Sequence, residues 1–169
     1  MPGGFGHFSP KVGFACDNVV EYEVVLACGS IVTASAKKFP DLFKALKGGG
    51  SNFGIVTKFT LRTFELGEVW GGSAFFMASD IAAHQDAFYE FAADPDYDEN
   101  AGLILNYAYT PDSGPLITNM YAYAKPVVNP TVFKPFTSTP GQMFNDTKIH
   151  SAMGPFSVSQ AQGSPAGNR

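Results

Sequence analysis

The sequence predicts an α+β fold in which antiparallel β-hairpins alternate with helices. Short segments of alternating apolar and polar residues, typical of half-buried strands, recur along the chain, and segments with helical spacing of apolar residues lie between them. Clusters of turn residues separate neighbouring strand segments, as in hairpins. The pattern therefore favours antiparallel sheets with helices inserted between pairs of strands.

The first part of the chain predicts a hairpin, a helix and a third strand. One face of the first strand carries apolar residues at alternate positions: Val20, Tyr22, Val24 and Leu26. Pro40 suits the first turn of the helix, and Gly48–Gly50 end it. The third strand alternates cleanly and is predicted to be half-buried. The predicted elements are strands over 18–27 and 31–34, a helix over 40–47 and a strand over 54–64.

The second part of the chain predicts three more strands and one longer helix. The strands cover 69–77, 101–110 and 115–125, and the helix covers 79–92. Ser79 and Asp80 are suited to cap that helix, and Pro111–Gly114 forms a turn between the last two strands. Residues 129–141 are Pro-rich and predicted to be irregular. No closing strand is visible in the tail from residue 142 onward.

Composition excludes several classes of protein. The 169 residues are 45% hydrophobic and 15% charged, which is enough apolar material for a packed core. The net charge of −4 and the absence of a basic patch argue against nucleic-acid binding. No apolar run reaches 18 residues, so no membrane span is predicted. The start of the chain lacks the basic and apolar regions of a signal peptide, and localisation is left unknown.

Three smaller features each allow a plain interpretation. Cys16 and Cys28 could form a disulfide, but two small buried residues near one strand is the favoured interpretation. The acidic segment 94–99 lacks the turn glycine of a calcium loop and is predicted to be a solvated connection, and we expect no metal site. Asn145-Asp146-Thr147 matches a glycosylation sequon, which matters only in a secreted chain.

Two glycine clusters are candidate cofactor-binding segments. The segment from Gly48 to Gly54 runs from helix to strand, the reverse of the dinucleotide fingerprint, and it lacks the Gly-Lys-Ser/Thr of a P-loop. It is either a tight turn or a set of backbone N–H groups that face a ligand. The second cluster, Gly3 to Gly6, precedes His7, which could be a flavin or substrate contact, a general base or a structural residue.

A polar and aromatic sheet face is the candidate substrate surface. It would be formed by alternating residues of two adjacent strands: Asn106, Tyr107, Tyr109, Asn119 and Tyr121. Asn and Tyr side chains suit the lining of a pocket for an organic molecule. Ordinary cross-strand aromatic packing is the favoured interpretation of the same residues.

Residues 3–64 as a whole resemble the second half of the flavin domain of FAD-linked oxidases. The similarity is to the berberine-bridge-enzyme-like group, fungal members in particular, with a PCMH-type FAD-binding domain. It rests on these residues: Gly3, Gly4, Gly6, Ser9, Lys11, Gly13, Asp17, Asn18, Val19, Pro40, Asp41, Leu42, Phe43, Gly48–Gly50, Asn52, Phe53, Gly54, Ile55 and Val56. The resemblance divides the chain into the C-terminal part of the FAD-binding domain, 1–66, and the start of an α+β substrate-binding domain, 67–169.

The resemblance implies FAD as a non-covalent cofactor. It places Gly3, Gly4, Gly6 and His7 close to the flavin or diphosphate, with Asn18 in the same site. It also implies that Gly54, Ile55 and Val56 approach the adenine-ribose end, partly through main chain. Neither His7 nor Cys16 matches the family's flavin-attachment positions. No catalytic residue is assigned.

The resemblance further implies a fragment of an FAD-dependent oxidoreductase that oxidises a small organic metabolite, with the flavin reoxidised by O₂. We expect the chain to lack the N-terminal flavin subdomain and the C-terminal part, and to need a partner chain for activity. The full-length family is often secreted. Two alternatives remain: a non-enzymatic small-molecule binding or interaction module that kept the fold, or a flavin-independent isomerase or cyclase.

Overall fold

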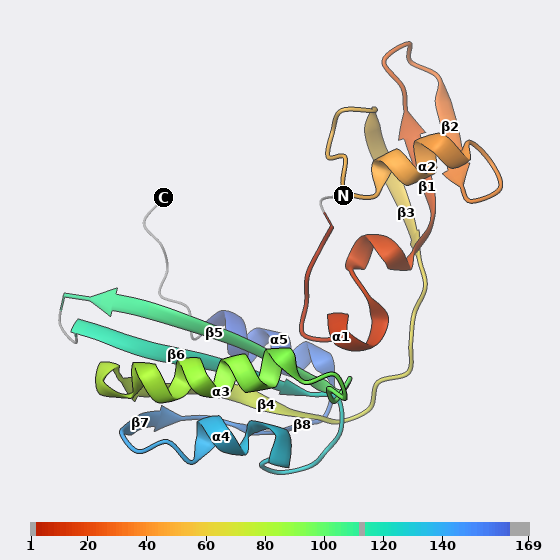
Figure 1. Ribbon diagram of the computed structural model, residues 1–169. Coiled ribbons are helices and arrows are strands. Elements are labelled where there is room, and N and C mark those ends of the chain that lie inside the picture. Colours follow the sequence, from red (N-terminus) through yellow and green to blue (C-terminus); the bar gives the residue numbers. More distant parts are fainter. Residues whose placement is uncertain (1–2, 112–113, 163–169) are drawn as a thin grey trace. The chain divides into compact units, whose positions relative to one another are not determined.

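The computed structural model describes residues 3–111 and 114–162, and the chain divides into two units, Met1–Glu65 and Leu66–Arg169. The division lies next to the predicted boundary between the two domains. The first unit is drawn in red to yellow and the second in yellow-green to blue in Figure 1. Of the predicted turn at Pro111–Gly114, the two central residues lie outside the described part of the chain.

Unit 1 is a three-stranded antiparallel sheet with a short helix on one face. Its elements are α1 (Ser9–Val12), the 3₁₀ helix η1 (Ala15–Asn18), β1 (Val19–Val25), β2 (Ile31–Ser35), α2 (Pro40–Leu46) and β3 (Ile55–Leu61). The strand order is β2-β1-β3, with both pairs antiparallel. The predicted strands and helix are therefore confirmed in kind and close to their predicted bounds.

The core of unit 1 lies between the sheet and α2. Its buried side chains are Val19, Tyr22, Val24, Ala34, Phe43 and Leu46. The prediction for Val20 is wrong, because the register shifts between Val19 and Glu21 and leaves this side chain 39% exposed. The prediction that β3 is half-buried is also wrong at Phe59 and Leu61, since both side chains are exposed.

Unit 2 is a larger antiparallel sheet covered on one face by helices. Its elements are β4 (Val69–Met77), η2 (Ala78–Asp80), α3 (Ile81–Ala93), β5 (Ala101–Thr110), β6 (Gly114–Tyr123), η3 (Thr131–Phe133), α4 (Lys134–Thr137), β7 (Gln142–Asn145), β8 (Lys148–His150) and α5 (Met153–Gln162). The strand order is β5-β6-β4-β7, and β8 also pairs with β4. The prediction that no strand follows residue 142 is wrong, because β7 and β8 both lie there.

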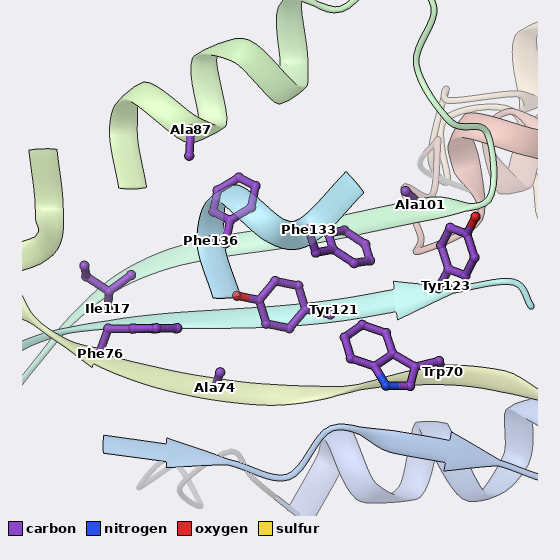
Figure 2. Close-up of a cluster of buried hydrophobic side chains, with 10 residues drawn as sticks. All are labelled: Trp70, Ala74, Phe76, Ala87, Ala101, Ile117, Tyr121, Tyr123, Phe133 and Phe136. Carbon is purple, nitrogen blue, oxygen red and sulfur yellow. The ribbon is translucent and has the colours of Figure 1, made fainter. Parts of the chain in front are cut away.

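An aromatic core joins the sheet of unit 2 to α3, η3 and α4 (Figure 2). Phe133 lies at its centre, with its ring centroid 5.9 Å from that of Trp70 and 5.1 Å from that of Tyr121. Phe136 on α4 is also fully buried. The Pro-rich segment that was predicted to be irregular therefore contributes η3, α4 and two fully buried core side chains.

Successive side chains of a strand point to opposite faces of the sheet, so the second face of this sheet carries a different set of side chains. Trp70, Ala74 and Phe76 of β4 face the helices, so Gly71, Ser73 and Phe75 face the opposite side. Helix α5 lies on that opposite side, with the ring of Phe156 close to Gly71. Helix α5 covers this face around Gly71 but leaves Asn106 of β5 exposed, and we call it the open face of unit 2.

Candidate functional site

The glycine segment Gly3–Gly6 is held in place by its carbonyl groups. The backbone N–H of Ala15 donates to the carbonyl of Gly4 at 2.8 Å, and that of Cys16 donates to the carbonyl of Gly3 at 2.9 Å. A Cβ added at Gly3 or Gly6 would meet nothing within 4 Å. No described atom therefore requires glycine at those two positions, and a ligand could approach the backbone there closely.

The two polar residues predicted beside this segment differ in their surroundings. His7 is half-buried, and burial lowers the pKa of its imidazole. The side-chain amide of Asn18 donates to the carbonyls of Val12 at 2.8 Å and Phe14 at 3.1 Å. Asn18 therefore ties the loop between α1 and β1 together, which positions the glycine segment.

The four glycines between α2 and β3 are explained by the local backbone geometry. Gly48 has φ of +102° and Gly50 has φ of +63°, a region that glycine adopts at little cost. A Cβ at Gly49 would lie 2.3 Å from the carbonyl oxygen of Ala45. At Gly54, a Cβ would lie 2.6 Å from the carbonyl oxygen of Val25. The plainer interpretation, a tight helix-to-strand turn, accounts for all four glycines.

Ile55 and Val56 face opposite sides of the unit 1 sheet. Val56 pairs with Val24 and packs against the buried core. Ile55 pairs with Val25 on the other face, and Val25 also pairs with Ile31 across the hairpin. Ile55 is 71% exposed and Ile31 68% exposed. These three residues form an apolar row on the uncovered face of the sheet, which we call the Ile55 row.

Strand β3 also lies at the edge of its sheet. It pairs with β1 on one side and with no strand on the other side among the described residues. Its main-chain N–H and C=O groups on that side are thus available to another strand or to a ligand. Phe59 and Leu61, on the face shared with α2, are 41% and 48% exposed. The edge and its apolar side chains make β3 the least covered strand of unit 1.

In unit 2, two of the predicted substrate residues are inside the core. Asn119 and Tyr121 are fully buried, and the amide of Asn119 donates to the Tyr121 hydroxyl at 2.9 Å. Burial raises the pKa of Tyr121 to about 12, although the hydrogen bond from Asn119 lowers it. These positions correspond to the packing interpretation that the sequence left open, and substrate contact by these two residues stays a prediction.

The other three predicted substrate residues lie on β5 and are exposed. Tyr107 and Tyr109 share the face of Leu105 and are 50% and 74% exposed, and Tyr107 lines a pocket between β5 and α3. Asn106 points to the open face and pairs with Thr118 of β6, which in turn pairs with Phe75 of β4. The structure therefore separates the five residues into a buried pair, an exposed tyrosine pair and one open-face amide.

Titratable groups elsewhere offer little chemistry. Among residues 3–111 and 114–162, no group of His, Cys, Asp and Glu is arranged to hold a metal ion. Cys16 and Cys28 are both free thiols. The prediction that both are buried is wrong for Cys28, which is exposed in the β1–β2 turn. No helix in the described part of the chain is long and apolar enough to cross a membrane.

Curated relatives of the chain are fungal proteins that are much longer than it. No protein-family model matches the chain. It is 43% identical over 139 residues to FAD-dependent monooxygenase CTB5 of Cercospora beticola, covering 80% of the chain and 26% of the relative. It is 43% identical over 142 residues to FAD-dependent monooxygenase elcE of Phaeosphaeria nodorum, covering 81% of the chain and 43% of that protein. Oligopeptidase PhomG' of Diaporthe leptostromiformis is 38% identical over 155 residues, but the match covers only 13% of it.

Solved structures show the same fold. Xylooligosaccharide oxidase from Myceliophthora thermophila matches 97% of the chain at a TM-score of 0.73 with 29% identity, and the match covers 35% of that oxidase. Physcomitrella patens BBE-like 1 matches 95% of the chain at a TM-score of 0.78 with 23% identity. The chain therefore has the fold of part of the berberine-bridge-enzyme-like oxidases and is related in sequence to fungal FAD-dependent monooxygenases. It spans about a third of the length of the solved proteins that it matches.

Several residues of the candidate site have no distinguishing signal of their own in the sequence. Val25 and Ile31 follow from the alternation of β1 and β2, because the face opposite Tyr22 and Val24 must carry them. Thr118 and Phe75 belong to the open face, and no local pattern distinguishes that face from the helix-covered one. Only the positions of α3 and α4 determine which face of the sheet is covered.

The residues present in unit 1 fit one end of an FAD molecule. A flat apolar ring suits the exposed Ile55 row, and Gly3 and Gly6 leave room for a closely approaching group. The carbonyls of Gly3 and Gly4 are already bonded within the chain, so this segment would hold a ligand through other groups. The fit is to an adenine-like ring and to contacts along a backbone.

Proposed function

We propose that this chain is part of an FAD-dependent oxidoreductase, in which unit 1 provides one wall of the FAD site. The observation that carries the proposal is the Ile55 row, an exposed apolar surface beside the unpaired edge of β3. The FAD-dependent fungal relatives support it. The whole enzyme would oxidise a small organic metabolite, and O₂ would reoxidise the flavin.

Each part of unit 1 has a separate task in this proposal. Ile55 packs its side chain on the adenine ring, while Val56 contributes main chain only because its side chain is in the core. Gly3, Gly4 and Gly6 let a second part of the cofactor lie against the backbone, near His7. When bound, FAD supplies the hydride-accepting chemistry, and the protein positions it and excludes water.

The open face of unit 2 is the proposed substrate wall. Asn106 offers a side-chain amide that both donates and accepts hydrogen bonds, and Thr118 offers a hydroxyl beside it. Phe75 in the neighbouring strand supplies apolar contact, with its ring centroid 5.0 Å from that of Phe144. A few polar groups on an apolar surface suit a small organic molecule.

The edge of β3 is the proposed contact for the rest of the flavin domain. A further strand would pair with this edge and cover Phe59 and Leu61. Self-pairing of two copies about the middle of β3 would place Lys58 opposite Lys58, and like charges directly opposite are destabilising. A different strand, from a chain or segment that supplies the missing flavin subdomain, is therefore the better partner.

FAD titration of the purified chain tests the proposal. Flavin fluorescence and thermal melting are followed together, first with the chain alone and then with the part of CTB5 that the chain does not match, added as a second chain. We expect FAD to bind and to raise the melting temperature, most strongly when both chains are present. Cooperative melting with no FAD response in either sample would contradict the proposal and favour a binding module or a flavin-independent enzyme.

The variant Ile55→Ala then tests the Ile55 row directly. We expect FAD binding to weaken by about tenfold, which equals roughly 1.4 kcal/mol of lost apolar contact. Because Ile55 is 71% exposed, the unliganded protein should keep its melting temperature. Ile149→Ala, at a partly exposed position in β8, is the matched control and should leave FAD affinity unchanged. If Ile55→Ala and Ile149→Ala bound FAD with the same affinity, the Ile55 row would not be part of the FAD site.

A further inference from the structure

We propose that Asn145 is an acceptor for N-linked glycosylation and that the glycan shields the outer edge of the unit 2 sheet. This modification site is independent of the flavin site described above. It lies in the turn between β7 (Gln142–Asn145) and β8 (Lys148–His150). The proposal concerns a chain that enters the secretory lumen of a eukaryotic cell.

The sequence offers one acceptor sequon. Asn145-Asp146-Thr147 has the required Asn, a residue other than Pro, and Thr. Asn129-Pro130-Thr131 has the same outer residues, but its central Pro excludes it as an acceptor. No other Asn of the 169 residues is followed two positions later by Ser or Thr. Modification is therefore expected at a single position.

The turn presents the asparagine side chain in a suitable arrangement. Oδ1 of Asn145 accepts hydrogen bonds from the Thr147 backbone N–H at 2.8 Å and from the Thr147 hydroxyl at 2.7 Å. Both bonds use the carbonyl oxygen of the side chain, whereas a glycan attaches to Nδ2. Glycosylation converts the primary amide to a secondary amide that keeps this oxygen, so both bonds survive the modification.

The middle residue of the sequon anchors the turn to the sheet. The backbone N–H of Ser73 donates to Oδ1 of Asp146 at 2.5 Å, and the backbone N–H of Asp146 donates to the carbonyl of Ser73 at 3.1 Å. Gly72, with φ of +151°, lets the turn approach, because a Cβ there would lie 2.7 Å from Cα of Thr147. Asn145 itself remains exposed, so the folded chain has room for a bulky group at this side chain.

The chemical step is a glycosyl transfer without redox change. A bond forms between Nδ2 of Asn145 and the anomeric carbon of the first sugar of a polyprenyl-pyrophosphate-linked oligosaccharide. The bond between that carbon and the pyrophosphate oxygen breaks, the lipid pyrophosphate leaves with the electron pair, and Nδ2 loses one proton to solvent.

The glycan would cover an exposed apolar edge. Strand β7 lies at the end of the strand order β5-β6-β4-β7, and its Met143 is 50% exposed. Exposed, apolar edge strands are prone to pair with other chains and aggregate. A hydrophilic glycan at the adjacent Asn145 would block such pairing, which gives the modification a physical benefit.

Cell-free translation with microsomal membranes tests the acceptor site. The 169-residue chain is given a secretory leader, and a reporter with an established sequon is translated beside it. We expect one mass increment that a glycosidase removes, and peptide mass spectrometry should place it at Asn145. Thr147→Ser should keep the increment, while Thr147→Val and Asn145→Gln should lose it completely. An unmodified chain beside a modified reporter would overturn the proposal.

A separate experiment tests whether the glycan shields the sheet edge from aggregation. Chain secreted from yeast is compared with the same material after glycosidase treatment, by light scattering during mild heating. We expect faster aggregation after the glycan is removed, and no such difference for Thr147→Val, which carries none. Equal aggregation of the treated and untreated chain would overturn the shielding role and leave only the acceptor site.

Discussion

The two units of this chain bury their sheets to different extents. In unit 2, α3, η3 and α4 cover most of one face, and ten buried side chains form a single core rich in aromatic residues. In unit 1, only α2 covers the sheet, six buried side chains form the core, and Phe59 and Leu61 on β3 stay exposed on the covered face. The alternation of apolar residues is similar in both sheets. It therefore predicts strands in both, but the burial of each strand depends on a second layer of helices, which is more extensive in unit 2.

The largest expected effect is at the centre of the unit 2 core. Phe133→Ala removes the ring that packs on Trp70 and Tyr121, and we expect it to lower the free energy of unfolding by about 3–5 kcal/mol. Urea unfolding followed by fluorescence checks this, because Trp70 is the single tryptophan and reports on unit 2. Tyr89→Ala, in α3 of the same unit at a side chain that is 73% exposed, is the control and should change the midpoint little. Equal effects of the two substitutions would contradict the expected contribution of the buried ring.

A backbone substitution tests unit 1. Gly54→Ala should destabilise β3 by roughly 1–3 kcal/mol, because φ is +142° and the new Cβ would lie 2.6 Å from the carbonyl oxygen of Val25. Amide hydrogen exchange should accelerate in β1 and β3, while β4 and β6 keep their protection. Gly67→Ala is the matched control, since a Cβ there meets no atom within 4 Å. Loss of protection in unit 2 as well would show that the two cores unfold together.

The smallest expected effect is at the edge of the unit 2 core. The Tyr123 hydroxyl donates to Asp98 at 2.7 Å, so Tyr123→Phe should lower the free energy of unfolding by about 1 kcal/mol at neutral pH. Burial would raise the pKa of the Asp98 carboxyl, but hydrogen bonds from Tyr123 and Asn100 hold it below 3.8. Burial and the bond to Asp98 raise the pKa of Tyr123 from 10.0 to about 12.

The direction of each pKa shift determines the pH range over which the hydrogen bond between Tyr123 and Asp98 stabilises the folded chain. Because the pKa of Asp98 is lowered on folding, its contribution is complete above pH 3.8 and is lost as the pH falls through the folded value. Because the pKa of Tyr123 is raised, its contribution is complete below pH 10.0 and is lost as the pH rises toward about 12. The difference between wild type and Tyr123→Phe should therefore shrink at both extremes. Tyr109→Phe, at a side chain that is 74% exposed, should show no such pH dependence.

Most of the regular elements could be predicted from sequence, and the failures have physical causes. Pro40 and Gly48–Gly50 bound α2 as expected, because each acts through its own backbone. Val20 is exposed because of a register shift between β1 and β3, which depends on pairing with a distant strand. Phe133 and Phe136 are buried although Pro-rich sequence surrounds them, because the sheet beneath supplies the packing.

The candidate site was less predictable than the fold. Ile55 and Val56 are neighbours in a strand, so alternation already required them to face opposite ways, but it could not show which face α2 covers. Asn119 and Tyr121 have the pattern of a polar surface and lie in the core, where the amide and the hydroxyl bond to each other. A pattern of polar and aromatic residues identifies a face of a sheet. It does not determine whether that face meets a helix or a ligand.

The division of the chain also has an evolutionary consequence. Each unit is one continuous stretch of sequence, so the backbone passes from one to the other only once, in the segment between β3 and β4. A single genetic crossover in that segment exchanges a complete core without cutting any strand pair of either sheet. Under the function proposed above, one such recombination event would replace the proposed substrate wall and leave the proposed cofactor wall unchanged.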